Sequence, residues 1–220
     1  VYKRQFLNHL KEGIALPEDL PALPIIAIPT TAGTGSEVTP WGTIWGDDGI
    51  KHSVSNGSLY PSFAVLDPNL TATMPKELTV ATGLDALSHS MEAVWNNRHT
   101  PISDAMASQS ISLLRKGLLK AVIDPNDIVA RQTVQTASTI AGLAMGTTQT
   151  ALAHSISYPF TSLYGVPHGL ACSFTLPEIA RYNMAPDTNR LLSIANGMGC
   201  QVEQIPSQIE AWYEDLGVAQ

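Results

Sequence analysis

The apolar residues of this chain change their spacing near Met74, and this change limits the folds that the chain can adopt. Before Met74, short apolar runs alternate with proline-containing connections. After it, apolar residues recur every three or four positions, and prolines fall mainly between such stretches. The first pattern is typical of strands and the second of helices. We therefore predict an α/β part over residues 1–73 and an all-helical part over residues 74–220.

Two apolar runs predict strands in the first part. Residues 24–29 form a short continuous run of the kind found in strands that are buried on both faces of a parallel sheet. Residues 63–66 repeat this pattern and are followed by Pro68, which ends the strand. The proline-rich segment 16–24 is expected to be a connector, because proline lacks an N–H donor and fixes φ.

A loop rich in glycine and hydroxyl side chains, residues 30–37, follows the first predicted strand. Glycines allow a ligand to approach the backbone, and open α/β sheets bind nucleotides at the carboxyl end of a strand. An ordinary loop explains the segment equally well. Downstream, residues 39–45 and 50–54 predict the two strands of a hairpin, joined by the turn residues 46–49.

The second part is predicted to consist of helices joined by short connections. The helix that follows Asp127 is rich in alanine and threonine, and its low side-chain bulk predicts that it is the central helix, packed on several sides. Proline and acidic residues mark several helix starts. The predicted helices span residues 75–96, 103–122, 127–145, 149–161, 169–182, 188–198 and 207–216.

Four side chains of the helical part have the chemistry of metal ligands. Asp85 and His89 are four residues apart, so on a helix they leave the same face. His154 lies in a later predicted helix, and His168 lies in a Pro-His-Gly turn that fixes the direction of its imidazole. One carboxylate and three imidazoles suit a divalent transition metal. The alternative is that the histidines are hydrogen-bonded core residues and that His168 is only a turn residue.

Charge and hydropathy argue against two classes of partner. Charged residues make up 14% of the chain and its net charge is −7, whereas nucleic-acid binding needs clustered Lys and Arg. The apolar runs are far shorter than the roughly 20 residues of a membrane span, and no signal-peptide core is present at the N-terminus. We expect a cytoplasmic protein. Cys172 and Cys200 are too few for a disulfide framework and are expected to be small buried side chains.

Four motifs lie at residues 28–37, 66–71, 81–89 and 167–169. Together they resemble the motifs of the iron-dependent (group III) alcohol dehydrogenase family. They occur in the same order and with approximately the same spacing as in that family, and the resemblance covers nearly the whole chain. The resemblance implies the fold that this family shares with glycerol dehydrogenase and dehydroquinate synthase. Residues 1–73 would then be the second half of a dinucleotide-binding α/β domain, and residues 74–220 a helical metal-binding domain that is incomplete at its C-terminus. We expect the chain to be the middle of a longer enzyme.

The resemblance also implies the ligands of the site. Asp85, His89, His154 and His168 match the family's metal ligands. The family analogy implies Fe(II), although the ligand types leave Zn(II) open. The expected cofactor is NAD or NADP, since the family's early strand, whose acidic residue would favour NAD, is missing from this sequence. The residues that match cofactor contacts are Thr30, Thr31, Gly33, Thr34, Thr39 and Lys51.

Tyr158 has two interpretations. Many members of the family carry a histidine four residues after the third metal ligand, and Tyr158 takes that position here. On a helix this offset from His154 points its hydroxyl toward the metal side, where it could relay a proton to the substrate oxygen. As a plain aromatic residue it would pack and bond its hydroxyl to the backbone.

Several other polar residues are expected to have structural roles. His9, His52 and His99 match no ligand position and are predicted to be surface residues. Glu37 and Glu92 are predicted to be capping or structural partners.

The resemblance implies a metal-dependent oxidoreductase that transfers a hydride between the nicotinamide cofactor and a small alcohol or aldehyde. The metal would polarise the substrate oxygen as a Lewis acid. Two alternatives stay open: a dehydroquinate synthase or glycerol dehydrogenase type of enzyme on the same fold, and an inactive metal-binding fragment. We expect a homo-oligomer that binds neither nucleic acid nor membrane.

Overall fold

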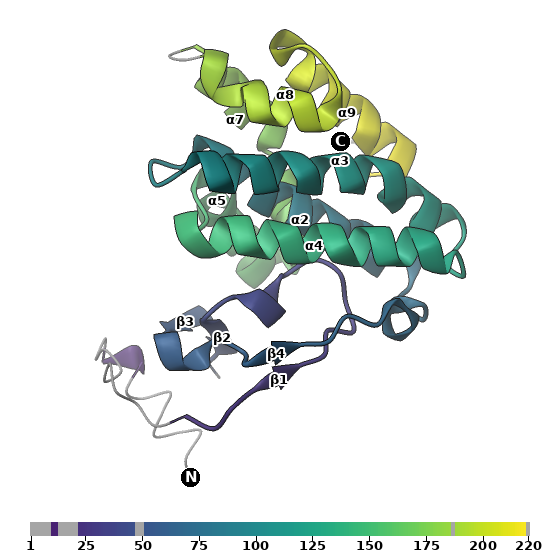
Figure 1. Cartoon of the computed structure of the whole chain (residues 1–220). Helices are drawn as coiled ribbons and strands as arrows, with labels where there is room; N and C mark the ends of the chain where they lie inside the picture. Colours follow the sequence, from purple (N-terminus) through teal and green to yellow (C-terminus); the bar gives the residue numbers. More distant parts are fainter. Residues whose placement is uncertain (1–9, 13–21, 47–50, 186–187, 219–220) are drawn as a thin grey trace.

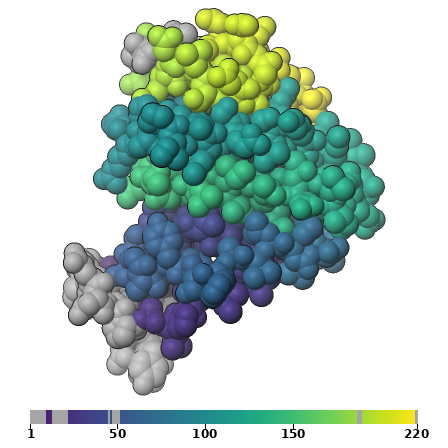
Figure 2. Space-filling view, in the orientation of Figure 1, coloured from purple at the N-terminus to yellow at the C-terminus, as the bar shows by residue number. Residues whose placement is uncertain are grey.

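A computed structural model of the protein describes residues 10–12, 22–46, 51–185 and 188–218. The chain forms a strand-containing layer below a stack of helices, with the C-terminal helices on the far side of the stack (Figure 1). The space-filling view shows the same three layers in sequence order, from the purple and blue N-terminal layer to the yellow C-terminal helices (Figure 2).

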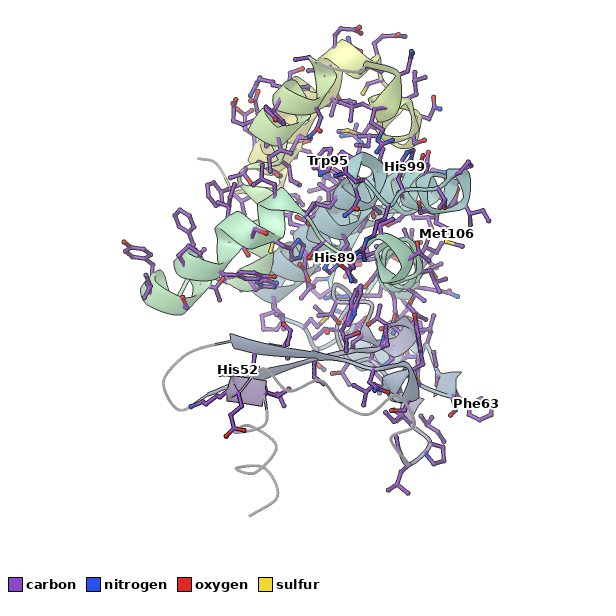
Figure 3. All side chains as sticks on the ribbon, turned by 90° about the vertical axis from the view of Figure 1, so that its left-hand side faces the viewer. His52, Phe63, His89, Trp95, His99 and Met106 are labelled. Carbon is purple, nitrogen blue, oxygen red and sulfur yellow. The ribbon has the colours of Figure 1, made fainter. Side chains whose placement is uncertain are left out.

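The first two strands predicted from apolar runs form, but they are short and exposed. β1 (Ile26–Ala27) pairs in parallel with β4 (Phe63–Ala64). The prediction of burial on both faces is wrong, since Ile26 is 62% and Phe63 is 67% exposed. The physical reason is that, among the described residues, these two strands pair only with each other. Phe63 accordingly points away from the protein (Figure 3).

The hairpin prediction is confirmed. β2 (Trp41–Trp45) and β3 (Lys51–Ser55) pair antiparallel, with Trp41 opposite Ser55 and Trp45 opposite Lys51. The turn predicted between them falls largely on residues 47–50, which lie outside the described part of the chain. The hairpin lies on the side of the strand layer that faces the helices (Figures 1 and 3).

The helical part follows the predicted order. Short 3-10 turns occur before and between the strands and helices, at η1 (Ser36–Val38), η2 (Gly57–Leu59), η3 (Pro68–Thr71), η4 (Thr188–Leu191) and η5 (Val202–Gln204). The helices are α2 (Lys76–Trp95), α3 (Pro101–Ile123), α4 (Ile128–Thr148), α5 (Leu152–Tyr164), α6 (His168–Ser173), α7 (Leu176–Met184), α8 (Leu192–Met198) and α9 (Ile205–Leu216).

The helix predicted over residues 169–182 is in fact two helices, α6 and α7. Pro177 lies at the start of α7 and cannot donate the backbone hydrogen bond that a continuous helix would direct to the carbonyl of Ser173. That carbonyl instead accepts a hydrogen bond of 2.6 Å from the hydroxyl of Tyr213 on α9. The hydrogen bond at this break therefore ties α6 to the C-terminal helix α9.

The central helix is α2, so the prediction that the alanine-rich helix α4 holds this place is wrong. The prediction that α4 packs on several sides is confirmed, since it contacts α2, α3, η1 and η3. Every residue of α2 from Gly83 to Trp95 is buried, whereas α4 leaves Val129 74% exposed. The small residues of α4 allow close contacts on more than one side. Ala130 and Thr133 of α4 lie against Gly117 of α3, and Gly142 lies against the loop before the hairpin. A Cβ on Gly35 would lie 2.5 Å from the Cα of Gly142, so the loop before the hairpin packs directly on the α4 backbone.

Among the described residues, no helix has both the length and the apolarity that crossing a membrane requires.

Candidate metal centre

The centre begins with two side chains of the buried helix α2. Asp85 and His89 are one turn apart and are 4% and 5% exposed. The Nε2 of His89 lies 3.8 Å from Oδ1 of Asp85. Because α2 is surrounded by protein along this stretch, both polar groups are held away from bulk water, where an unmatched polar atom is costly.

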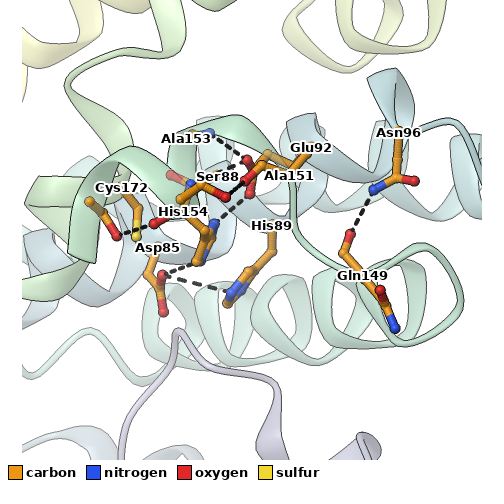
Figure 4. A network of polar contacts seen from close by, with 12 residues as sticks. Asp85, Ser88, His89, Glu92, Asn96, Gln149, Ala151, Ala153, His154 and Cys172 are labelled. Atoms are coloured by element: carbon orange, nitrogen blue, oxygen red, sulfur yellow. Dashed lines mark hydrogen bonds and ion pairs between the residues drawn. The ribbon is translucent and has the colours of Figure 1, made fainter. Parts of the chain in front are cut away.

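The third side chain, His154, comes from the first turn of α5. Its Nε2 lies 3.5 Å from Oδ1 of Asp85, and its ring stacks on the ring of His89 with 4.7 Å between centroids and 14° between planes. Figure 4 shows these side chains together, at the meeting of α2, α5 and α6. Their positions follow from the packing of the N-terminus of α5 against α2.

Glu92, also on α2, fixes the orientation of His154. Its Oε1 accepts hydrogen bonds from the backbone N–H of Ala153 at 2.7 Å and of His154 at 3.3 Å, and its Oε2 contacts Nδ1 of His154. A carboxylate can only accept, so Nδ1 carries the proton and the imidazole directs Nε2 toward Asp85. The prediction that Glu92 is a capping or structural partner is confirmed.

The fourth side chain, His168, lies at the start of α6. Its ring centroid is 5.5 Å from that of His154 in an edge-on arrangement. The next residue explains this approach, because a Cβ on Gly169 would lie 1.8 Å from the carbonyl oxygen of Ala81. Only glycine lets α6 pack this closely on α2.

The structure thus brings together the four side chains that the sequence suggested as ligands, and it adds one that was missed. Cys172 is fully buried, and its Sγ lies 3.6 Å from Nε2 of His168. One potential ligand atom each from Asp85, His154, His168 and Cys172 lies within 4.8 Å of all the others. The signal in the sequence was the spacing of four from His168 to Cys172, which matches that from Asp85 to His89.

Three buried atoms of this group make no hydrogen bond within the described residues: Oδ1 of Asp85, Nδ1 of His89 and Nε2 of His154. A buried polar atom left without a partner costs about 1–3 kcal/mol. A cation bound to oxygen and nitrogen lone pairs would remove this cost. The residues therefore fit a divalent metal ion.

The protonation states of Asp85, His89 and His154 depend on their burial and on the charged groups around them. Burial alone would raise the pKa of Asp85, but the imidazoles of His89 and His154 outweigh it and hold this pKa well below its usual value. Burial lowers the pKa of His89. Burial also acts to lower the pKa of His154, but the neighbouring Asp85, Cys172 and Glu92 outweigh it and raise this pKa overall. An ionised carboxylate and a neutral His89 are the forms that bind metal, whereas His154 must release a proton.

A cavity of about 670 Å³ opens beside this group. One wall is the helical part with the metal-ligating candidates, and the other is the hairpin, which lies below His89 in Figure 3. The lining residues are Thr34, Ser36, Thr39, Trp41, Gly42, Thr43, Ser53, Val54, Ser55, Asp85, His89, Met145, Gln149, Thr150, His154, Tyr158 and His168.

The residues matched to cofactor contacts separate into three groups. Thr34 and Thr39 line the cavity, whereas Thr30, Thr31 and Gly33 do not. Gly33 has a packing reason instead, since a Cβ there would lie 2.6 Å from the carbonyl oxygen of Thr82. Lys51 lies in β3, but its side chain is outside the described part of the structure. The role of all six in cofactor binding stays a prediction.

Tyr158 lines the cavity and is 38% exposed, a position that is compatible with both of its interpretations.

The other polar residues differ partly from expectation. Glu37 is buried and accepts a hydrogen bond of 2.6 Å from Thr139, which confirms a structural role. His52 and His99 are half-buried rather than on the surface, and His99 bonds Asp104 at 2.8 Å. His9 lies outside the described residues.

Carboxylate and imidazole groups gathered at the wall of a large cavity are typical of metal-dependent enzymes. The family described as "Fe-containing alcohol dehydrogenase family, C-terminal" matches residues 79–218, and "Iron-containing alcohol dehydrogenase" matches residues 2–68. The chain belongs to the iron-containing alcohol dehydrogenase family, which confirms the resemblance drawn from the four motifs.

Individual relatives support this membership. The chain is 37% identical over 192 residues to the NAD-dependent methanol dehydrogenase of Bacillus methanolicus. The matched region covers 87% of this chain and 50% of that enzyme. It is 36% identical over 180 residues to the 1,3-propanediol dehydrogenase of Klebsiella pneumoniae, covering 81% of this chain and 46% of that enzyme. The chain therefore spans about half the length of the curated relatives that it matches.

The fold also matches solved structures. Sulfoacetaldehyde reductase from Bifidobacterium kashiwanohense in complex with NAD+ superposes with a TM-score of 0.90 at 38% identity, over 96% of this chain and 56% of that one.

Proposed function

We propose that the chain carries the metal centre and part of the substrate pocket of an oxidoreductase that transfers a hydride between NAD(P)(H) and a small alcohol or aldehyde. The observation that supports this most strongly is the convergence of Asp85, His89, His154 and His168 at the wall of the cavity. The NAD-dependent relatives and the NAD+ complex support the nicotinamide cofactor.

In this proposal Asp85, His89, His154 and His168 hold the metal, with Fe(II) as the expected ion and Zn(II) as the other candidate. When bound, such an ion acts as a Lewis acid on the substrate oxygen. One carboxylate and three neutral imidazoles leave a divalent centre with net positive charge, which favours an oxygen that gains negative charge. Glu92 keeps Nε2 of His154 in its ligating orientation, as its contact with Nδ1 implies.

The hairpin side of the cavity is proposed to receive the cofactor and the distal part of the substrate. Thr34 and Thr39 are the cofactor-matched residues that face this space, and Trp41 adds an apolar surface. A nicotinamide cofactor bound there would supply the hydride. Tyr158, on the helical side, is proposed to relay a proton to the substrate oxygen.

The lining also favours an uncharged substrate. Apart from Asp85 and the histidines, the described residues that line the cavity are neutral, and neither Lys nor Arg is among them. Lys and Arg are the side chains that usually recognise an anionic substrate. This disfavours a dehydroquinate synthase type of reaction and favours a small neutral alcohol or aldehyde.

The dehydroquinate synthase-like fold, the domain boundary near residue 73, the cytoplasmic location and a homo-oligomeric state are part of the same proposal. The separation of a strand-containing layer from a helical stack supports the boundary.

An activity assay with a metal readout tests the proposal. The purified chain would be mixed anaerobically with NADH and a panel of short aldehydes, with and without Fe(II), and its metal content would be measured in parallel. Oxidation of NADH that requires Fe(II) supports the full proposal. Bound metal without turnover would contradict aldehyde reduction and leave the two alternatives, another reaction on the same fold or an inactive fragment. Absence of both would refute the centre itself.

A further inference from the structure

The helix α6 carries two potential metal ligands on one face. Cys172 follows His168 by four residues, and its Sγ lies 3.7 Å and 3.6 Å from the two ring nitrogens of His168. Cys172 is fully buried. Its thiol therefore faces the interior of the centre and not the solvent.

The distances suit direct coordination. In a tetrahedral site with metal–ligand bonds of about 2.0–2.3 Å, two ligand atoms lie about 3.3–3.8 Å apart. The separation from Asp85 Oδ1 to His154 Nε2 is 3.5 Å, and that from His168 Nε2 to Cys172 Sγ is 3.6 Å. Two edges of a tetrahedron are thus already at their expected length.

The compact group does not include His89. One potential ligand atom from each of Asp85, His154, His168 and Cys172 lies within 4.8 Å of the others. His89 approaches Asp85 only to 3.8 Å, and its ring stacks on that of His154. Two atoms of the compact group, Oδ1 of Asp85 and Nε2 of His154, are buried and make no hydrogen bond within the described residues. These atoms independently indicate a cation at this point.

We propose that Cys172 supplies a thiolate to the metal centre, so that Asp85, His154, His168 and Cys172 form a second ligand set that selects Zn(II) over the harder Fe(II). The inference rests on the metal centre of the proposed function and adds a ligand to it. Thiolate is a soft ligand that favours zinc, whereas carboxylate and imidazole alone discriminate less between the two ions.

The two ligand sets differ in the net charge of the metal-loaded centre. With Asp85 and three imidazoles a divalent ion keeps one net positive charge, but with Asp85 and the Cys172 thiolate the set is neutral. When zinc binds in the second set, the S–H bond of Cys172 is replaced by an S–Zn bond and the proton passes to the buffer. A neutral centre would polarise a substrate oxygen less, so the zinc-loaded form would be less active.

Co(II) tests the thiolate directly, because it enters zinc sites and has visible absorption bands. Anaerobic titration of the intact chain with Co(II) should give visible bands together with a near-ultraviolet thiolate charge-transfer band. Cys172→Ser should lose the charge-transfer band, keep the visible bands and bind Zn(II) at least about tenfold more weakly. Its affinity for Fe(II) should stay unchanged. The matched control is Cys200→Ser, which changes the other free, half-buried thiol and should keep the band.

A second variant keeps the test decisive if Cys172→Ser folds poorly. His89→Ala should retain the charge-transfer band, because His89 is outside the second ligand set. Visible bands without any charge-transfer band in the wild type would overturn the role of Cys172 and leave the proposed function standing. If the wild type binds no Co(II), Zn(II) or Fe(II), the metal centre fails and this inference fails with it.

Discussion

Glu92 holds His154 at two points: its Oε1 accepts from the backbone N–H of His154 at 3.3 Å, and its Oε2 contacts Nδ1 of the same residue. The carboxylate thereby caps the start of α5 and sets the imidazole tautomer. Burial alone would raise the pKa of Glu92, but the hydrogen bond from His154 outweighs it and lowers this pKa, so the group is ionised. The sequence suggested a structural role for Glu92, but not this pairing.

Replacing Glu92 by Gln is therefore expected to weaken metal binding by about 10–100-fold, the usual effect of removing an orienting partner of a metal-bound histidine. Metal affinity would be measured by competition with a chromophoric chelator. Glu37→Gln is the matched control, because Glu37 is also buried but contacts Thr139 and not the centre. Equal metal affinities for Glu92→Gln and the wild type would refute the orienting role.

Gly169→Ala is expected to destabilise the fold by about 3 kcal/mol or more, at or beyond the upper end of ordinary overpacking. The added Cβ would lie 1.8 Å from a backbone carbonyl oxygen of Ala81, so α6 would have to move and carry His168 with it. Thermal unfolding measures the loss, and metal affinity should fall in parallel. Gly57→Ala, whose Cβ would meet nothing within 4 Å, should leave both quantities unchanged.

Gln149→Gly is expected to stabilise the protein. Gln149 has φ of 69° and ψ of 173°, a backbone region that is populated almost only by glycine and costs other residues about 1–3 kcal/mol. Glycine would relieve this strain at an entropic cost of about 0.5–1 kcal/mol. A net gain near 1 kcal/mol would raise Tm by about 2–4 °C for a chain of this size. Gln149→Ala keeps the strain and should not raise Tm; a lower Tm for the glycine variant would show that the side chain stabilises the fold.

Tyr158→Phe is expected to lower the rate of aldehyde reduction by about 10²-fold if the hydroxyl relays a proton, as proposed. The ring, which lines the cavity, is retained, so metal binding and thermal stability should not change. Steady-state rates across a range of pH provide the measurement. Unaltered turnover with an unaltered pH profile would leave Tyr158 with a packing role.

Local patterns predicted most of the elements, but not the contacts between distant segments. The helix starts and the hairpin follow from proline, turn residues and apolar spacing, and the ligand spacing from Asp85 to His89 is visible on one helix. The break between α6 and α7 depends on Pro177, and the carbonyl that it frees finds its partner in Tyr213, far along the chain.

Local patterns also failed to predict how the helices pack against one another. Low side-chain bulk in α4 predicts a central helix, yet α2 holds that place. The small residues of α4 instead allow close contacts with the loop at Gly35 and with Gly117 of α3. The sequence predicts a small buried side chain at Cys172, and the residue is buried. Only the meeting of α2, α5 and α6 shows that its sulfur lies beside three candidate ligands.

The central claim is that one metal ion is held where Asp85, His154 and His168 meet, and removal of His168 tests it most directly. His168 belongs to both ligand sets and lies at the end of a helix, so His168→Ala should keep the fold, as judged by circular dichroism. Elemental analysis after anaerobic loading with Fe(II) and with Zn(II) should give one ion per wild-type chain, and at least about 100-fold weaker binding in the variant. Full occupancy by either metal in a folded His168→Ala protein would contradict the assignment.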